Sequence, residues 1–216
     1  GNSGTKGEYK TLRGEGNVVL DFSHSSYGME LWGDYWVLSN FTIRNTIDGK
    51  KGLQIAGDHN IVEFITAEFC GDTGIQISGS SLDSKDKWPK DNLVQYCISH
   101  DNSDIAMNNA DGFAAKLTVG EGNRFLGCVS YNNADDGWDL FSKIETGAIG
   151  KVRVEKCIAF SNGVLSDGRS GGDGNGFKLG GDGIGVEHEL VDSIAFNNLS
   201  NGVTSNSNPK CRVINV

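Results

Sequence analysis

The chain has 216 residues, a formal net charge of -9, 31 glycines and only 2 prolines. This length fits one domain with a core of its own, and the acidic balance excludes a basic nucleic-acid-binding face as the main surface. Abundant glycine with little proline argues against a disordered linker and indicates many tight turns between short strands. No apolar run approaches the roughly 18 residues of a membrane span, so we expect neither nucleic acid nor a membrane as a partner.

A glycine followed by alternating apolar residues recurs along the chain and marks an internal repeat. These glycines are Gly28, Gly52, Gly74, Gly112, Gly137, Gly176 and, more weakly, Gly202. Their successive spacings are 24, 22, 38, 25, 39 and 26 residues, so the two long spacings indicate a normal repeat plus an insertion. The expected insertions are residues 80–91 in one repeat and residues 143–150 with 163–174 in another. Residues 1–27 are expected to form an earlier partial coil.

Each repeat also carries a second short segment whose alternate positions form columns of matching residues. One column is Phe41, Ile65, Cys97, Cys128, Cys157 and Ser193. A reduced cysteine behaves as a small hydrophobe, so its three cysteines are expected to form a buried, reduced stack. An asparagine column follows at Asn102, Asn133, Asn162 and Asn198. Stacked amides at a turn can pass hydrogen bonds from one coil to the next.

Alternation with a period of two inside repeats this short leaves room for strands and turns but not for helices. The pattern predicts an all-β, single-stranded parallel β-helix in which neighbouring coils pair about 4.8 Å apart. We expect seven to eight coils in one domain over residues 1–216. Neither end carries an obvious polar cap, so we expect a fragment of a longer chain. A leucine-rich repeat is the rival solenoid, but its LxxLxLxxN pattern is missing.

Stacking the repeats on their glycines brings four carboxylates together from two adjacent coils. The residue before the glycine is Asp111 in one coil and Asp136 in the next, with Asp135 beside it. Asp139 stands two residues after Gly137, in a polar column expected to face outward. Oxygen donors without histidine or cysteine favour Ca²⁺ over Zn²⁺, and Mg²⁺ avoids all-protein carboxylate cages. The four aspartates are therefore the predicted calcium ligands; the alternative is that each only caps a turn beside glycine.

Lys178 occupies the same outward column, one coil above Asp139. A lysine beside a metal can act as a general base if the cation and desolvation lower its pKa against the pull of the carboxylates. The alternative is a salt bridge between Lys178 and Asp139. Lys143 and Arg169, in the expected insertions, are candidates to bind an anionic substrate, with ordinary surface charge as their alternative.

Three motifs carry a resemblance to a known family: NNADGFAAK at 108–116, YNNADDGWDLF at 131–141 and GNGFKLGG at 174–181. Over most of its length the chain resembles the family 9 polysaccharide lyases of the pectate lyase type. The resemblance implies a right-handed parallel β-helix, a Ca²⁺ site whose four aspartates map onto the four predicted ligands, and a catalytic lysine that maps onto Lys178.

The activity that this resemblance implies is β-elimination on an acidic polysaccharide. A bridging Ca²⁺ would let an acidic protein bind the polyanion, and Lys178 would remove the proton alpha to the substrate carboxylate. The uronate polymer stays open between pectate or polygalacturonate and rhamnogalacturonan, as does endo or exo cleavage. We expect a secreted or cell-surface bacterial protein that acts as a monomer.

Two other functions stay open. A pectin-type glycoside hydrolase would use paired aspartates as acid and base, and Asp135 with Asp136 could form such a pair. Against it, chains of that kind carry Gly-His-Gly and Arg-Ile-Lys motifs, which are absent here. A non-catalytic, calcium-stabilised β-helix that binds carbohydrate would bind calcium and polymer without turnover.

Overall fold

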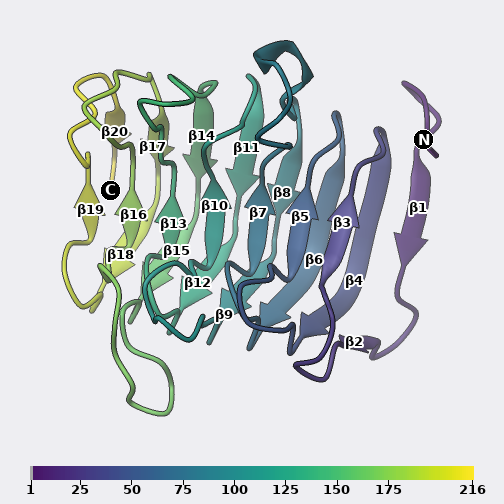
Figure 1. Cartoon of the computed structure of the whole chain (residues 1–216), viewed down its shortest axis with the longest axis horizontal. Coiled ribbons are helices and arrows are strands. Elements are labelled where there is room, and N and C mark those ends of the chain that lie inside the picture. Colours follow the sequence, from purple (N-terminus) through teal and green to yellow (C-terminus); the bar gives the residue numbers. More distant parts are fainter. Residues whose placement is uncertain (1) are drawn as a thin grey trace.

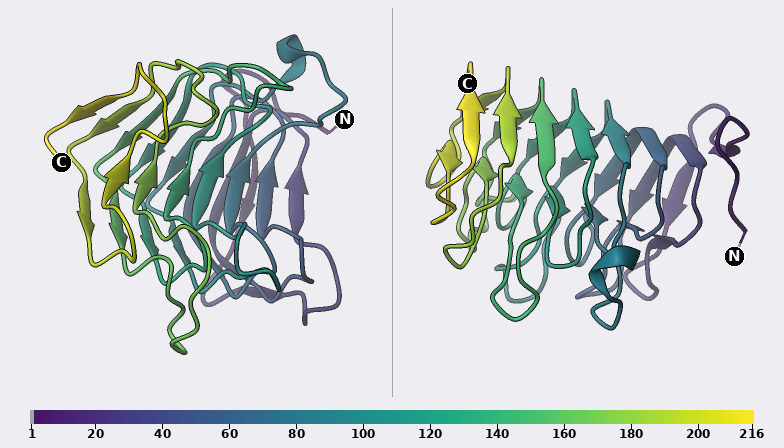
Figure 2. Two further views of the ribbon diagram at one scale, coloured as in Figure 1. Left: turned by 60° about the vertical axis from the view of Figure 1, so that its left-hand side comes forward. Right: turned by 90° about the horizontal axis from the view of Figure 1, so that it is seen from above.

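The computed structural model describes residues 2–216 and shows a chain wound into stacked coils of short strands (Figure 1). Every ladder between named strands in this range is parallel. The turned views in Figure 2 show the coils following one another in a row along the long axis. The predicted parallel β-helix is therefore confirmed.

One sheet receives a strand from each of seven coils. Its order is β3 (Met29–Leu31), β5 (Leu53–Ile55), β7 (Ile75–Ile77), β10 (Phe113–Ala115), β13 (Trp138–Asp139), β16 (Phe177–Lys178) and β19 (Val203–Thr204). The strands begin directly after the repeated glycines, so the register predicted from the sequence is the observed one. Seven strands agree with the expected seven to eight coils.

The second sheet supplies the other two sides of each coil. One side holds β8 (Leu93–Gln95), β11 (Asn123–Leu126), β14 (Val152–Glu155), β17 (Glu189–Val191) and β20 (Arg212–Ile214). The other holds β9 (Ile98–His100), β12 (Val129–Tyr131), β15 (Ile158–Phe160) and β18 (Ile194–Phe196). Both sides meet in the long strands β4 (Trp36–Arg44) and β6 (Ile61–Glu68), which pair with each other.

The N-terminal residues form the expected partial coil. Both β1 (Lys10–Arg13) and β2 (Val19–Asp21) pair with β4, while Gly1 lies outside the described residues. Residues 80–91 form a loop that contains η1 (Lys85–Lys87), a single helical turn. Residues 143–150 and 163–174 are loops closed by the isolated bridges Lys143–Gly147 and Val164–Ser170. The predicted insertions are thus loops outside the coil. No helix in residues 2–216 is long and apolar enough to span a membrane.

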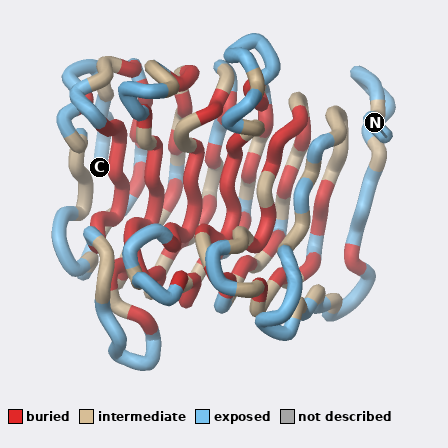
Figure 3. Tube along the Cα trace, viewed as in Figure 1, coloured by how far each residue is buried: buried red, intermediate tan, exposed pale blue. Residues whose placement is uncertain are grey.

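The core runs along the inside of the coils and is continuous through the middle of the molecule (Figure 3). Phe113, Trp138 and Phe177 follow one another in successive coils with ring centroids 4.7 and 4.8 Å apart, and all three are fully buried. Trp138, which directly follows Gly137, thus lies in the core. Cys97, Cys128 and Cys157 are buried and unpaired, as predicted for their column.

The asparagine column forms a ladder of side-chain hydrogen bonds across four coils. Each amide nitrogen donates to the next residue's Oδ1: Asn102 to Asn133 at 2.8 Å, Asn133 to Asn162 at 3.0 Å and Asn162 to Asn198 at 2.9 Å. The first three side chains are fully buried, while Asn198 is half-buried. The ladder therefore satisfies polar groups that water does not reach.

Replacing Asn133 by alanine should lower the free energy of unfolding by about 2 to 4 kcal/mol, because the buried Asn102 amide loses its acceptor and several bonds are deleted. Asn198→Ala takes the acceptor from buried Asn162, but it does so at the half-buried end of the ladder, where water can replace the lost bonds. Its cost should therefore be smaller, about 1 to 2 kcal/mol. Urea denaturation of both variants measures the difference. Equal losses would contradict the ladder as the source of the stability.

Candidate metal and catalytic site

The register of three neighbouring strands brings the predicted site residues together. Ala114 in β10 pairs with Asp139 in β13, which pairs with Lys178 in β16. Asp111 lies just before β10 and Asp136 just before β13, and the Asp136 N–H donates to Asp111 Oδ1 at 3.2 Å. The predicted vertical pairing of Asp111 with Asp136 is therefore confirmed.

The glycine after each of these aspartates is required by close packing. A β-carbon at Gly112 would lie 2.0 Å from Ser130 Oγ, and one at Gly137 would lie 2.5 Å from the Gly176 carbonyl oxygen. No side chain fits at either position, so the strands can approach their neighbours closely. This packing fixes the residue before the glycine at the entrance of each strand, where the carboxylates stand.

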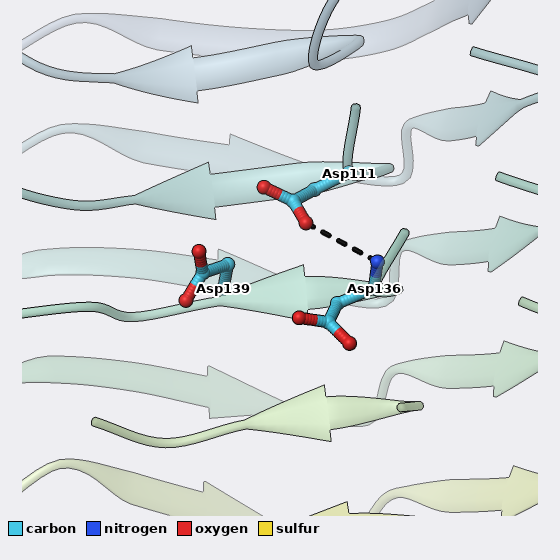
Figure 4. A group of neighbouring side chains, drawn as sticks. All are labelled: Asp111, Asp136 and Asp139. Carbon is cyan, nitrogen blue, oxygen red and sulfur yellow. Dashed lines mark hydrogen bonds between the residues drawn. The ribbon is translucent and has the colours of Figure 1, made fainter. Parts of the chain in front are cut away.

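Carboxylate oxygens of Asp111, Asp136 and Asp139 lie within 4.8 Å of one another, and Figure 4 shows them turned toward a common space. Asp111 and Asp136 are fully buried, and Asp139 is 5% exposed. Two oxygens in this group, Asp136 Oδ2 and Asp139 Oδ1, are buried and accept no hydrogen bond in the described part of the chain. Buried acceptors without donors are costly unless a cation completes them.

The donor set fits calcium. It consists of carboxylate oxygens from two adjacent coils, without cysteine or histidine, and calcium prefers oxygen ligands in adaptable geometries. The two oxygens without hydrogen bonds are available to bind such an ion. Asp111, Asp136 and Asp139 are therefore the residues that would hold it.

Asp135 belongs to a second, overlapping group. One of its oxygens lies within 4.8 Å of oxygens from Asp136 and Asp173, and Asp136 is the member common to both groups. Asp135 Oδ1 also accepts the Asp173 backbone N–H at 2.5 Å. The four predicted ligands thus form two groups joined at Asp136, and Asp173 is an acidic neighbour that the repeat pattern missed.

Burial and mutual repulsion change the acidity of this cluster. Burial raises the pKa of Asp111 well above its ordinary value, although Lys116 pulls it down. Burial also raises the pKa of Asp136, against the pull of Lys178. Burial and then the Asp136 charge raise the pKa of Asp135 to about 7. The cluster therefore binds protons near neutral pH unless a cation replaces them.

Lys178 projects away from the core as predicted, but it does not stand on an open face. It is only 9% exposed, and its Nζ donates to Asp173 Oδ2, in the insertion 163–174, at 2.9 Å. The predicted alternative of an ion pair with Asp139 is not the observed contact. Nζ lies 2.9 Å from Asp173 Oδ2 and 3.2 Å from Asp136 Oδ2. Burial lowers the pKa of Lys178, but Asp139, Asp136 and Asp173 raise it more, so its net pKa is above the ordinary value.

The sequence patterns did not single out Lys116 as a site residue, although it lies in the carboxylate cluster. Its Nζ lies 2.7 Å from Asp111 Oδ2 and 3.1 Å from Asp139 Oδ2, between two predicted ligands. The available signal was its place at the end of the NNADGFAAK motif, in the same short segment as Asp111. For Asp173, the signal was its acidic position between glycines in the insertion just before Lys178.

The two cations predicted to bind substrate lie in different places. Lys143 is exposed and lines a groove of about 550 Å³ together with Lys116, Asp139, Gln76 and Lys51. This groove runs beside the carboxylates on the outer side of the seven-stranded sheet.

Arg169 is 65% exposed and pairs with Asp167 at 2.9 Å. It lines a separate hollow with Asp101 and Asp104. The geometry therefore places Lys143, and not Arg169, on the groove beside the carboxylate cluster.

The chain has close relatives among pectate lyases. Residues 1–216 match the family model described as "Pel9A-like, right handed beta helix region". Pectate lyase L of Thermoclostridium stercorarium is 49% identical over 218 residues, covering 99% of this chain and 18% of that protein. Pectate lyase L of Paenibacillus polymyxa is 45% identical over 220 residues, covering 97% and 49%. The solved structure of pectate lyase Pel9A has a TM-score of 0.85 at 32% identity, covering 99% and 53%.

The fold is therefore a right-handed parallel β-helix. The chain belongs to the Pel9A-like β-helix family, which confirms the resemblance to the family 9 polysaccharide lyases. It spans about half the length of the Paenibacillus relative and of the solved chain, and less of the Thermoclostridium protein.

Calcium affinity should fall as the pH decreases below about 7, because protons on Asp135 and Asp111 must leave before the ion binds. A single competing proton gives a loss of about tenfold per pH unit. Calorimetric titration with calcium chloride at pH 8, 7, 6 and 5 measures this loss of affinity. In Asp135→Asn, the affinity should fall less over the first pH steps below 8. An affinity that stays constant down to pH 5 would contradict the arrangement.

Proposed function

We propose that this chain carries the catalytic centre of a calcium-dependent polysaccharide lyase that cleaves a uronate polymer by β-elimination. One observation carries the proposal. The carboxylates of Asp111, Asp136 and Asp139 converge with two buried oxygens that accept no hydrogen bond, and Lys178 Nζ forms an ion pair with one of them, Asp136 Oδ2, at 3.2 Å. Membership of the Pel9A-like family agrees with this chemistry.

The groove beside the cluster supports an acidic polymer as the substrate. It lies against Asp139 and is also lined by Lys51, Lys116 and Lys143. Asp72 and Asp104 also line the groove, and Lys51 and Lys116 form ion pairs with aspartates. Lys143 and a calcium ion on the cluster would therefore attract the polyanion that the net charge of -9 would otherwise repel. A polymer of this kind lies outside cells, so we propose that the protein acts as a secreted or cell-surface enzyme.

Calcium held by Asp111, Asp136 and Asp139, with Asp135 beside them, would withdraw electrons from the substrate carboxylate and stabilise the charge that develops there. The role of Lys178 is to take the proton alpha to that carboxylate. The bond to the 4-oxygen then breaks with its electron pair on that oxygen, which takes up a proton from solvent. A carbon–carbon double bond forms, so no water attacks. Lys178 is only 9% exposed, so little water surrounds its amine.

Lys178 must lose its own proton before it can act as a base. Asp139, Asp136 and Asp173 raise its pKa, so they keep it protonated at neutral pH. A divalent cation among the same aspartates opposes their pull. The rate is therefore expected to rise with pH, and calcium loading and base activation are expected to go together.

Lys178→Ala should reduce uronate cleavage by about 100-fold to 10,000-fold, the usual contribution of a general base. Calcium binding should be retained. The assay follows the ultraviolet absorbance of the unsaturated product on a panel of uronate polymers, with and without a chelator. Lys151→Ala is a suitable control because that lysine pairs with Glu189 in another sheet.

The outcomes of this assay separate the alternatives. Cleavage without the new double bond would indicate a hydrolase. Calcium and polymer binding without any cleavage by the wild type would indicate a binding module. Activity that persists in the presence of the chelator would contradict the metal assignment.

Asp173→Asn should move the rising limb of the pH–rate profile to lower pH, by roughly half a unit or more. The reason is the sign of the interaction: the carboxylate 2.9 Å from Lys178 stabilises the ammonium form, and its removal favours the neutral amine. Asp167 lies in the same loop but pairs with Arg169, so Asp167→Asn should leave the rising limb of the pH–rate profile in place. A limb that does not move in Asp173→Asn would contradict Lys178 as the titrating base.

A further inference from the structure

Lys116 lies inside the carboxylate cluster, where the proposed reaction gives it no role. Its Nζ is bonded to Asp111 Oδ2 at 2.7 Å and to Asp139 Oδ2 at 3.1 Å. The lysine side chain is 16% exposed, and those of Asp111 and Asp139 are 0% and 7% exposed. These are short, charge-assisted bonds in a site that largely excludes water.

The ammonium bonds one oxygen of each of these two carboxylates. The second oxygen of Asp139 is buried without a hydrogen bond, as is Oδ2 of Asp136. Asp111 Oδ1 is engaged by the Asp136 N–H. Lys116 therefore holds two ligands from adjacent coils in place without occupying Asp139 Oδ1, which has no partner in the described residues, or Asp136 Oδ2, which faces Lys178 Nζ at 3.2 Å.

We propose that Lys116 is a positioning residue, the internal counter-ion of the calcium site. Its charge holds Asp111 and Asp139 together in the metal-free protein and, by the same charge, weakens calcium binding. The inference rests on the calcium site of the proposed function but not on the lyase reaction. It predicts a calcium affinity set by a lysine that need not bind the metal.

The two other lysines near the site do not satisfy the same conditions. Lys178 contacts Asp136 but has its closer partner in Asp173, whose side chain is 58% exposed. Lys143 lines the groove but makes no ion pair within residues 2–216. Only for Lys116 are both carboxylate partners buried members of the proposed ligand set.

The direction of the effect follows from linkage. A positive charge beside the carboxylates stabilises the metal-free form and repels a divalent cation that approaches the same oxygens. Removing the charge must therefore destabilise the metal-free protein and strengthen calcium binding, because both changes reflect one coupling free energy.

The test compares Lys116→Met with Lys143→Met, which removes a charge from the same groove without breaking an ion pair. Each protein is stripped with a chelator, dialysed at pH 8, and examined by thermal melting and by calorimetric titration with calcium chloride. Lys116→Met should melt several degrees lower without calcium and bind calcium at least tenfold more tightly than the wild type. Lys143→Met should melt as the wild type does and change the affinity less than threefold.

Each outcome supports or contradicts the counter-ion role proposed for Lys116. An unchanged or weaker calcium affinity in Lys116→Met, with a wild type that binds calcium, contradicts the counter-ion role alone. A wild type that binds no calcium contradicts the calcium site and the inference with it. If Lys116→Met does not fold without calcium, Lys116→Gln is compared. Recovery of either variant by calcium supports the inference, and failure of both to fold even in excess calcium overturns it.

Discussion

In-register parallel pairing between adjacent coils is the constraint on which the fold and the site both depend. Ala114, Asp139 and Lys178 are direct strand partners although long stretches of sequence separate them. Because paired strands lie about 4.8 Å apart, residues at matching positions are brought together whatever their charge. The chain cannot relieve repulsion between Asp111 and Asp136 by sliding one coil, since a shift of one residue would turn the core side chains outward.

Asp111 and Asp136 stand in a column that continues as amides in the two later coils. In later coils the same position holds Asn175 and Asn201, and the Asn201 amide donates to Asn175 Oδ1 at 2.8 Å. The Asn175 amide in turn donates to Asp136 Oδ1 at 2.8 Å. The ladder ends there, because a carboxylate has no N–H to pass on. A carboxylate in place of a ladder amide thus leaves Asp136 Oδ2 outside the ladder, where it faces the Lys178 ammonium at 3.2 Å and is placed to meet a cation.

The sequence predicts the site residues whose places are set by the repeat. Asp111, Asp136, Asp139 and Lys178 follow from the glycine spacing and a period of two, since these fix both the coil and the side of the strand. The insertions do not repeat, so their path depends on local turns and contacts that spacing does not specify. For this reason three features could not be predicted: the contact of Asp173 with Lys178, the burial of Lys178, and the separate position of Arg169.

Lys116 escaped prediction for a different reason. Its place in the chain is well determined, because it follows β10 directly. The direction of a long, flexible side chain depends on the charges around it rather than on its position in the repeat.

The two lysines of the cluster differ in what holds them, and that difference matches the roles proposed for them. Both partners of Lys116 are buried at positions fixed by the coil register, so its contacts change only if the ligands themselves move. Lys178 pairs with Asp136, which is also a proposed metal ligand, and with Asp173, which lies on a surface loop. A contact with a loop can open without disturbing the core, so Lys178 can exchange a proton and approach a substrate. Lys116 is therefore held only by residues whose positions the coil register fixes. Lys178 is held in part by the insertion, through a contact that can open.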